Sequence, residues 1–334
     1  MPLPLNWSSG TNGVSPENLM RTMTGPFSRL VDASLGADVG TSHTTLQAAW
    51  NAASEGDSIF VKPGTYGAGL SVSSGAGNLK HNITIVCDFG WHRNNASQAR
   101  FTAPWTIVGA KGLRIYGAVV KGATGSGFAL ESLEDSKLVG CVAEDPTVDG
   151  FSMTKLKQCH LVGCVAETPG NRGFLMYDDC WRNVLDYCEA NDPVSNGFGL
   201  DAFPTTNTMS EWNWLRSCLV RDGGGHGFSA TLKNSGATNG WQHLFLEHCA
   251  AVSNAGDGFN FSNGAADSYL TLGDCEAFNN TSAGFRVGGT NPDSRWAATG
   301  NRSRGNGAGN WLGTWSGVTG YAINGLSAPG TNVQ

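Results

Sequence analysis

The sequence predicts an all-β fold: a single-stranded parallel β-helix, a solenoid with three short strands in each coil and a short capping helix at its N-terminal end. Two repeats that keep step with each other predict it. The dipeptide Gly-Phe returns at intervals of 23 to 31 residues, at Gly127, Gly150, Gly173, Gly197, Gly227, Gly258 and Gly284. A cysteine returns at matching intervals, at Cys141, Cys164, Cys188, Cys218, Cys249 and Cys275. Because the two spacings lengthen and shorten together, they mark one unit that stacks on its neighbours.

The composition agrees with a folded, turn-rich chain and narrows its function. Glycine accounts for 47 of the 334 residues, 40% of residues are hydrophobic and only 14% are charged, which favours β-structure over disorder. The formal net charge is −6 and no Lys/Arg cluster is present, so nucleic acid is not expected as a partner. No apolar run is long enough for a membrane span, and the N-terminus shows no secretory signal peptide.

The nine cysteines would suit disulfides or a metal cluster, but their placement favours neither. The count is odd, and six of them occupy one position of the repeat. A zinc site needs closely spaced Cys or His ligands, which Cys159 and Cys164 do not supply. We therefore expect no metal site and buried free thiols that pack as small hydrophobic groups.

The first strand of each coil, the Phe strand, begins at the Phe of the repeat. Two residues after it comes an apolar residue in every coil: Leu130, Met153, Met176, Leu200, Ala230, Phe261 and Val287. The residues between and after them are mostly polar or small, so Phe and its second neighbour face the core while the others face out. The Gly before each Phe is expected to adopt a backbone conformation closed to other residues.

The cysteine register supplies two more strands, the Leu strand and the Cys strand. A small apolar residue such as Ala143 follows each Cys by two positions, and a Leu such as Leu138 precedes it by three. Since a spacing of three breaks the alternation of a strand, a corner falls between the two. Equivalent strands of successive coils lie about 4.8 Å apart in a sheet, so Phe, Leu and Cys should each form a ladder. Residues 113–120 and 295–311 fit the same template.

A helix should close the N-terminal end of the solenoid. Residues 44–54 place four apolar side chains on one helical face, namely Leu46, Ala49, Trp50 and Ala53. The segment GDSIFVKPGTY that follows, residues 56–66, is typical of a strand, a turn and a second strand. An exposed β edge invites pairing with other chains, and a helix before the first coil would cover it.

A helix, the GDSIFVKPGTY segment and stacked coils together resemble the pectin-lyase-like superfamily, in particular pectate-lyase-type proteins and bacteriophage tailspikes. The resemblance covers residues 44–66 and about 110–311. It implies a right-handed β-helix, and its members cleave, epimerise or bind acidic and neutral polysaccharides. We expect an N-terminal extension or anchor at 1–40, the β-helix at 41–311 and a Gly-rich C-terminal tail or cap at 312–334.

The two longest coils indicate where a site could lie. Their additional residues fall between the Phe strand and the Leu strand, at 202–213 and 232–242. Two adjacent long loops would form a wall, and a groove beside a wall can hold a long polymer. The outward face of the Phe strands leads into this wall.

Carboxylates, lysines and a tyrosine gather where that face meets the wall. The catalytic candidates are Asp178, Asp201, Asp179 and Lys155, and the substrate-binding candidates are Tyr177, Glu131 and Lys233. Paired carboxylates carry out glycoside hydrolysis, and Asp178 and Asp201 lie on adjacent coils, with backbones about 5 Å apart along the axis. Each candidate could equally cap a turn.

A lyase would need different groups from a hydrolase. It would use a base near the sugar C5 proton and a cation to neutralise the uronate. Lys155, Lys233, Arg172 or a calcium ion held by the aspartates could provide that cation. No other cofactor is expected, and the sequence leaves hydrolase and lyase open.

Two segments resemble motifs of the polygalacturonase-type hydrolases of glycoside hydrolase family 28. Asp178-Asp179-Cys180 is similar to that family's Asp-Asp pair, and Gly225-His226-Gly227 to its Gly-His-Gly. The resemblance would make both aspartates catalytic acids and His226 a helper. The two segments lie two coils apart here, no Arg-x-Lys follows, and His226 also fills the position before Gly-Phe that holds Arg172 in another coil.

Two tryptophans, Trp212 and Trp241, lie on the long-loop side, where flat aromatic faces could stack on sugar rings. The alternative is that they pack against the protein. The sequence thus supports an extracellular polysaccharide-binding and polysaccharide-degrading β-helix protein of phage tailspike or depolymerase type. The rival is a non-catalytic virion structural, decoration or receptor-binding protein on the same fold.

The expected location is extracellular or on a virion surface. Polysaccharides lie mostly outside cells, and phage proteins reach them by lysis without a signal peptide. The expected partner is a polysaccharide, with no membrane, and the sequence leaves open a homotrimer or attachment to a larger virion assembly.

Overall fold

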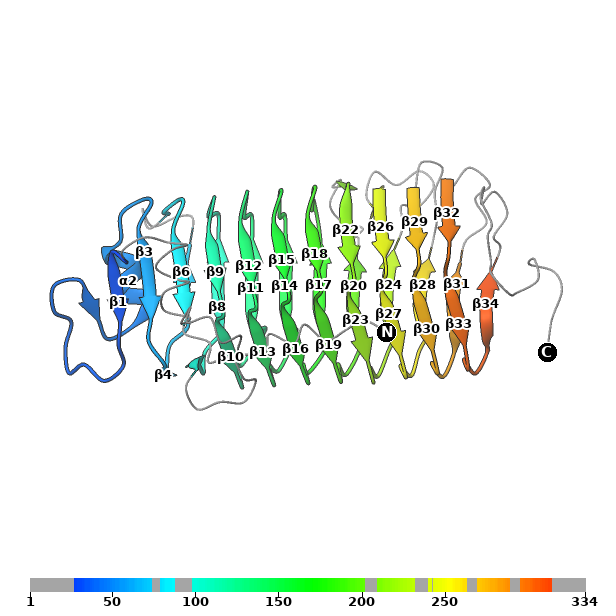
Figure 1. Ribbon diagram of the computed structural model, residues 1–334, viewed down its shortest axis with the longest axis horizontal. Helices are drawn as coiled ribbons and strands as arrows, with labels where there is room; N and C mark the ends of the chain where they lie inside the picture. Colours follow the sequence, from blue (N-terminus) through cyan, green and yellow to red (C-terminus); the bar gives the residue numbers. More distant parts are fainter. Residues whose placement is uncertain are drawn as a thin grey trace, which may run out of the picture.

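The computed structural model describes residues 27–73, 79–87, 98–201, 209–231, 240–241, 243–262, 269–288 and 295–313. It confirms the predicted fold: a rod in which three parallel sheets run side by side along the axis, with each coil giving one strand to each sheet (Figure 1). The predicted ladder of three strands per coil is therefore correct. In the described part of the chain, no helix is long and apolar enough to cross a membrane.

The sheet built from the Leu strands, here the Leu sheet, has twelve strands. In spatial order these are β2 (Ser42–His43), β1 (Arg29–Val31), β3 (Ser58–Val61), β6 (Thr84–Cys87), β9 (Arg114–Tyr116), β12 (Lys137–Val139), β15 (His160–Val162), β18 (Val184–Asp186), β22 (Asn213–Arg216), β26 (His243–Glu247), β29 (Tyr269–Gly273) and β32 (Arg295–Thr299). β1 lies within residues 1–40 and pairs directly with β3.

The Cys sheet and the Phe sheet have ten strands each. The Cys sheet contains β4 (Gly64–Tyr66), β7 (Ala99–Phe101), β10 (Val119–Lys121), β13 (Val142–Glu144), β16 (Val165–Glu167), β19 (Glu189–Asn191), β23 (Leu219–Arg221), β27 (Ala250–Val252), β30 (Glu276–Phe278) and β33 (Arg302–Arg304). The Phe sheet contains β5 (Ser71–Val72), β8 (Trp105–Val108), β11 (Phe128–Glu131), β14 (Phe151–Thr154), β17 (Phe174–Tyr177), β20 (Phe198–Asp201), β24 (Phe228–Thr231), β28 (Phe259–Ser262), β31 (Ala283–Val287) and β34 (Gly309–Gly313).

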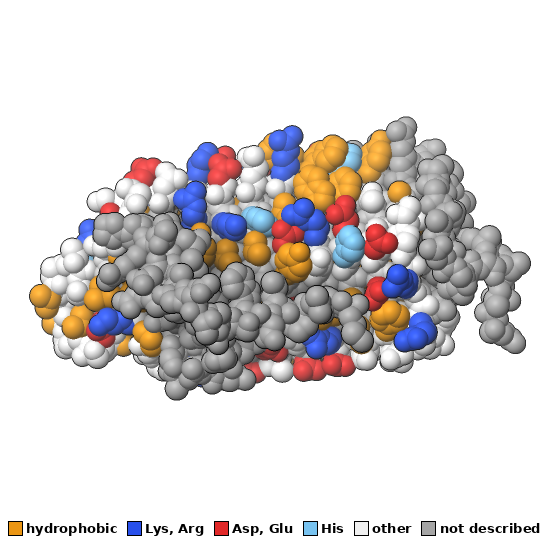
Figure 2. Space-filling view, viewed as in Figure 1, with side chains coloured by type: hydrophobic (Ala, Val, Ile, Leu, Met, Phe, Trp, Pro, Cys, Tyr) orange, Lys and Arg blue, Asp and Glu red, His pale blue; other side chains and the backbone are white. Residues whose placement is uncertain are grey.

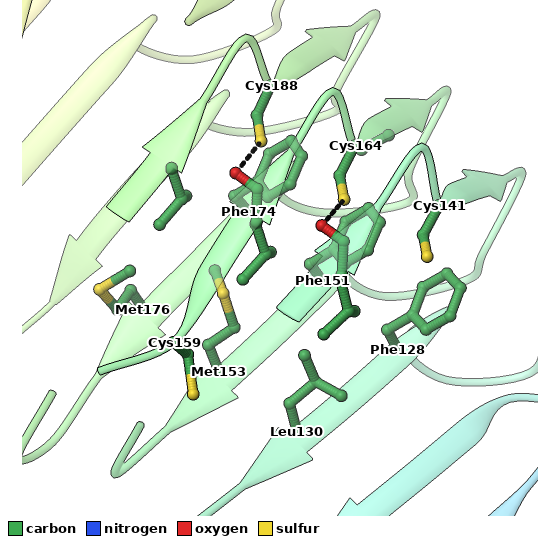
Figure 3. Packing of buried hydrophobic residues seen from close by; sticks show 14 of the residues in the cluster. Phe128, Leu130, Cys141, Phe151, Met153, Cys159, Cys164, Phe174, Met176 and Cys188 are labelled. Atoms are coloured by element: carbon green, nitrogen blue, oxygen red, sulfur yellow. Dashed lines mark hydrogen bonds between the residues drawn. The ribbon is translucent and has the colours of Figure 1, made fainter. Parts of the chain in front are cut away.

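The core consists of the predicted ladders. From Phe128 to Phe285, successive rings stack with centroids 4.7–4.9 Å apart and planes within 8° of parallel. All nine cysteines are buried free thiols. Six of them donate an Sγ–H hydrogen bond to the carbonyl of a buried Leu one coil earlier, as from Cys188 to Leu161 at 3.6 Å (Figure 3). Backbone carbonyl groups beside the core thus gain a hydrogen-bond donor that carries no charge.

The glycine before each Phe plays a different role from the one predicted. None of the seven has a positive φ, so the expected special conformation is wrong. What the position lacks is space: a Cβ on Gly127 would lie 2.6 Å from Ala143 Cβ and 2.9 Å from the Gly150 carbonyl oxygen. The stacked glycines before each Phe and the stacked alanines two residues after most of the repeat cysteines therefore pack closely only because both are small.

Positive φ occurs instead at the corners. Between the Leu and Cys strands one residue per coil is left-handed, with φ of 49–60° at Gly140, Gly163, Tyr187, Ser217, His248 and Asp274. Left-handed backbone bends the chain sharply within one residue, and Gly, Asn and Asp tolerate it best. At other corners the left-handed residue is often an aspartate, as at Asp135, Asp145, Asp192 and Asp222.

A helix covers the N-terminal end as predicted. α2 (Leu46–Ala52) begins at Thr45, whose Oγ1 accepts the N–H of Ala48 at 3.1 Å. Leu46, Ala49 and Trp50 are buried against the first strands of the Leu sheet. Of the long loops that were expected to form a wall, residues 202–208, 232–239 and 242 lie outside the described residues. In the described part, β21 (Met209–Ser210) and β25 (Gly240–Trp241) pair in parallel.

Gly127→Ala should destabilise the rod by about 1–3 kcal/mol, the usual effect of an oversized group in a close-packed core. Unfolding in urea would measure it. Gly67→Ala is the matched control, because a Cβ there meets no atom within 4 Å. A Gly127→Ala variant as stable as Gly67→Ala would contradict the packing explanation.

Candidate functional site

A charged cluster lies on the outer face of the Phe sheet between β17 and β20. Arg172 Nη2 is 2.8 Å from Asp201 Oδ2, and the two side chains are 25% and 26% exposed. Arg172 precedes β17 and Asp201 ends β20, so the arginine side chain runs along the sheet to reach its partner. Gly199 leaves space for the Arg172 side chain, since a Cβ at position 199 would lie 2.8 Å from Arg172 Cδ.

A second carboxyl group, Asp149, is buried next to the start of Arg172. Its Oδ1 accepts Asn171 Nδ2–H at 2.9 Å and the backbone N–H of Arg172 at 3.1 Å, and the residue is only 4% exposed. Burial raises the pKa of Asp149, the charge of Asp201 adds to the rise, and the N–H and charge of Arg172 oppose it. Arg172 therefore joins two carboxyl groups held in different environments.

This arrangement has two chemical capacities. A carboxyl group whose pKa is raised by burial can carry a proton nearer to neutral pH and give it up as a general acid. A partly exposed guanidinium can bind the carboxylate or hydroxyl oxygens of a ligand through its planar array of N–H groups. The cluster can therefore combine proton donation with the binding of an oxygen-rich ligand.

The carboxylate pair predicted from the sequence is arranged differently. Asp178 and Asp201 do lie on adjacent coils, but the register places Asp201 beside Tyr177. Asp178 follows one residue later, at the corner, while the charged partner of Asp201 is Arg172. The ends of β14, β17 and β20 thus bring Tyr177, Asp178 and Asp201 to one edge of the Phe sheet.

Several candidates are corner residues with left-handed backbone. The φ angles of Lys155, Asp178, Asp179 and Trp212 are 54°, 50°, 45° and 55°. Lys155 Nζ lies 4.0 Å from Glu131 Oε1, and Asp179 Oδ2 lies 3.6 Å from the amino group of Lys157. Such exposed ion pairs stabilise little. Asp178 and Asp179 thus lie at a corner of the chain, and their alternative role as turn caps stays a prediction.

His226 lies in a separate cluster, two coils beyond Arg172. Its Nδ1 accepts the backbone N–H of Asp257 at 2.9 Å, and its Nε2 is 2.9 Å from Asn260 Nδ2. Arg286 Nε lies 2.7 Å from Asp257 Oδ2. The pKa of His226 lies below its ordinary value because the ring is buried, and the charge of Asp257 offsets only part of this effect. Both ring nitrogens are held by protein groups, and the structure does not bring His226 to Asp178 or Asp179.

The two aromatic candidates, Trp212 and Trp241, differ in their exposure to solvent. Trp241 is fully buried, so its ring cannot stack on a sugar, and that prediction is corrected because the tryptophan packs into the rod beside β24. Trp212 is 38% exposed, and its ring stacks on His243 with centroids 4.1 Å apart. Lys233 lies outside the described residues.

Sequence reasoning missed Asp149 and the role of Gly199. The signal was present in both cases. Asp149 and Arg172 occupy the position before Gly-Phe in consecutive coils, and Gly199 is a glycine where the Phe strands otherwise carry an outward side chain. Among the described residues, no group of three or more His, Cys, Asp or Glu side chains is placed to hold a metal ion.

Comparison with known proteins supports the fold. No protein-family model matches the chain, and no curated protein matches its sequence. The structure is similar to pectate lyase Pel9A, with a TM-score of 0.57, 13% identity, and 90% of this chain and 84% of that chain covered. It is similar to the A-module of the mannuronan C-5 epimerase AlgE6 of Azotobacter vinelandii, with a TM-score of 0.52, 14% identity, and coverage of 82% and 86%.

A viral protein has the same architecture. ORF18 of Geobacillus virus E2 is similar with a TM-score of 0.58 and 12% identity over 88% of this chain, which spans 61% of that protein. At these identities the likeness shows the fold alone. That fold is the right-handed parallel β-helix implied by the resemblance to the pectin-lyase-like superfamily.

Asp149→Asn should stabilise the protein at neutral pH and lose this advantage in acid. The folded pKa of Asp149 lies above its ordinary value of 3.8. At pH values above this raised pKa, the buried charged carboxylate therefore destabilises the folded state. This destabilisation fades as the pH falls through the raised pKa towards 3.8. An amide cannot ionise, and its oxygen still accepts the two N–H groups.

Urea unfolding at pH 7 and at about pH 4 would measure the difference, with the exposed corner variant Asp192→Asn as control. An equal effect of Asp149→Asn at both pH values would show that the Asp149 carboxylate carries no burial penalty.

Proposed function

We propose that the protein binds a polysaccharide along the outer face of the Phe sheet and cleaves it. The observation that carries this proposal is the Arg172–Asp201 ion pair, which is about a quarter exposed on the outer face of the Phe sheet, beside the buried Asp149 carboxyl. Enzymes in the same fold support it, because pectate and mannuronan, which two of them act on by name, are polysaccharides.

Each residue of the cluster would have a separate role in binding or catalysis. Arg172 binds an acidic or hydroxyl group of the sugar, and Asp149 gives a proton to the leaving oxygen. In a hydrolase Asp201 would serve as base or nucleophile, and in a lyase it would take the sugar C5 proton. Tyr177, Lys155 and Asp178, at the edge of the same sheet, would contact neighbouring sugars.

The proposed setting is the outside of a cell or the surface of a virion. A rod built as one continuous β-helix suits a phage tailspike or depolymerase, and a viral protein has a similar fold. Attachment to a virion assembly or trimer formation would then present the Phe sheet to a polysaccharide coat.

A second candidate function is binding without cleavage, in a structural or receptor-binding protein. The corner positions of Lys155, Asp178 and Asp179 favour it, because these residues already have a structural role. The low exposure of Asp149 favours it as well.

Activity assays separate these functions. The full chain would be incubated with pectate, alginate and bacterial capsule, following reducing ends for hydrolysis and ultraviolet absorbance of unsaturated uronates for elimination. Arg172→Ala, Asp149→Asn and Asp201→Asn should each reduce the rate about 100-fold or more, as expected for acid–base or charge-stabilising groups.

Asp178→Asn is the informative companion variant. If Asp178 only forms the corner, activity stays within a few-fold of the original protein, since Asn also accepts left-handed backbone. A loss as large as that of Arg172→Ala would make Asp178 catalytic. Binding of these polymers without any product would select the second function, and absence of binding would overturn both.

Gly199→Ala should weaken polysaccharide binding about tenfold while leaving the fold intact. The added Cβ would displace Arg172 from the sheet, and one charge-assisted contact is commonly associated with a change of this size. Ser229→Ala, at the same position one coil further, is the control. Unchanged binding by Gly199→Ala, with both variants folded by circular dichroism, would remove Arg172 from the binding site.

A further inference from the structure

Stacked aromatic rings cover part of the outer face of the Leu sheet, far from the Arg172 cluster in the coil. Trp214 stacks on Phe245 with centroids 5.0 Å apart and an angle of 10°. Beside them, Trp212, His243 and Tyr269 stack at 4.1 and 4.5 Å. These side chains belong to the orange and pale blue surface over β22, β26 and β29 at the upper right of Figure 2.

The direction of stacking decides which surfaces a ligand can reach. The rings stack along the rod axis, so inner rings cover each other's faces and present only their edges to solvent. Trp214 is at the end of its stack. Its neighbour on the other side is Val184 of β18, whose short side chain covers only the part of the indole nearest the backbone. Trp214 therefore presents an aromatic face towards β18.

Polar groups flank this face. Asp186, only 8% exposed, accepts Arg216 Nε–H at 2.7 Å and Nη2–H at 2.8 Å, and its Oδ2 lies 2.7 Å from His160 Nε2. Because a carboxylate only accepts, Nε2 carries the hydrogen, and Nδ1 is left to contact a ligand. Among the described residues, neither His160 Nδ1 nor Arg216 Nη1 has a hydrogen-bond partner.

The spacing leaves room for one ring. His160 and Val184 are neighbours in the register, as are Val184 and Trp214. His160 and Trp214 are thus two coils, or about 10 Å, apart along the axis. A ring placed over Val184 would lie in van der Waals contact with the indole, within reach of His160 Nδ1 and Arg216 Nη1.

We propose that Val184, Trp214, His160 and Arg216 form a subsite for a single neutral sugar ring, the Val184 subsite. The C–H face of a pyranose stacks on an indole, and two adjacent hydroxyls would meet His160 Nδ1 and Arg216 Nη1. Since the sugar follows the plane of the indole, it lies across the rod axis. The subsite takes a terminal or branch sugar, and it is independent of the function proposed for the Phe sheet.

The test uses the full chain and the methyl glycosides of glucose, galactose and mannose, with methyl galacturonoside as the acidic probe. Saturation-transfer NMR and calorimetry follow binding. At least one neutral glycoside should bind with a Kd of about 1 mM, a usual affinity for a single small contact site. Val184→Trp extends the stack by one ring, covers the indole face and should weaken binding at least tenfold.

Val139→Trp, on the outward side of β12 in the same sheet, is the matched control and should bind like the original protein. Trp214→Leu, which removes the indole but keeps an apolar side chain, should lose binding as well. Three results would overturn the subsite: no neutral glycoside binds, Val184→Trp binds as the original protein does, or the galacturonoside binds more tightly than all neutral probes. Affinity that rises steeply with oligosaccharide length would overturn the terminal-sugar assignment.

Discussion

Hydrogen bonds between successive coils hold equivalent residues about 4.8 Å apart along the rod, and the other contacts depend on that distance. It falls within the range of centroid separations of offset-stacked aromatic rings, so the Phe ladder runs from Phe128 to Phe285 with its rings almost parallel. It also brings the coils so close at the Gly-Phe position that Gly127 and Ala143 leave no room for another methyl group. Close stacking thus selects both the large and the small residues of the repeat.

Because the coils stack closely, a residue that departs from the repeat creates a local site with its own chemistry. Most outward positions of the Phe sheet carry a side chain, and the glycine at 199 leaves a place for the guanidinium of Arg172. The cluster then contains a buried carboxyl, an arginine and a partly exposed carboxylate that come from three successive coils. A polymer lying along the rod would meet these groups in order, which suits a site for a long polysaccharide.

The outer face of the Leu sheet shows another consequence. Aromatic residues in register stack on each other, so a longer ladder adds stability without adding ring faces for a ligand. Only the end of the Trp214 stack, beside Val184, differs. The two faces would therefore recognise sugars in different orientations, one along the axis and one across it.

The sequence by itself determined the coil. The Phe, Leu and Cys positions, the corner between the Leu and Cys strands and the N-terminal helix all follow from local periodicity, because burial of alternate side chains is decided within a few residues. The reason for the repeated glycine was not predictable in this way, since the atoms that exclude a Cβ at Gly127 belong to other strands. Candidate residues such as Asp178 were recognised by type, but their corner backbone was not.

Only the tertiary structure decided which outward side chains meet. Arg172 reaches past its neighbours in register to Asp201, and His160, Asp186 and Arg216 converge from three coils. These contacts depend on the lengths and directions of long side chains and on the absence of one at Gly199. The spacing of a repeat says which strands are neighbours, whereas the space above a sheet is set by every side chain that lies on it.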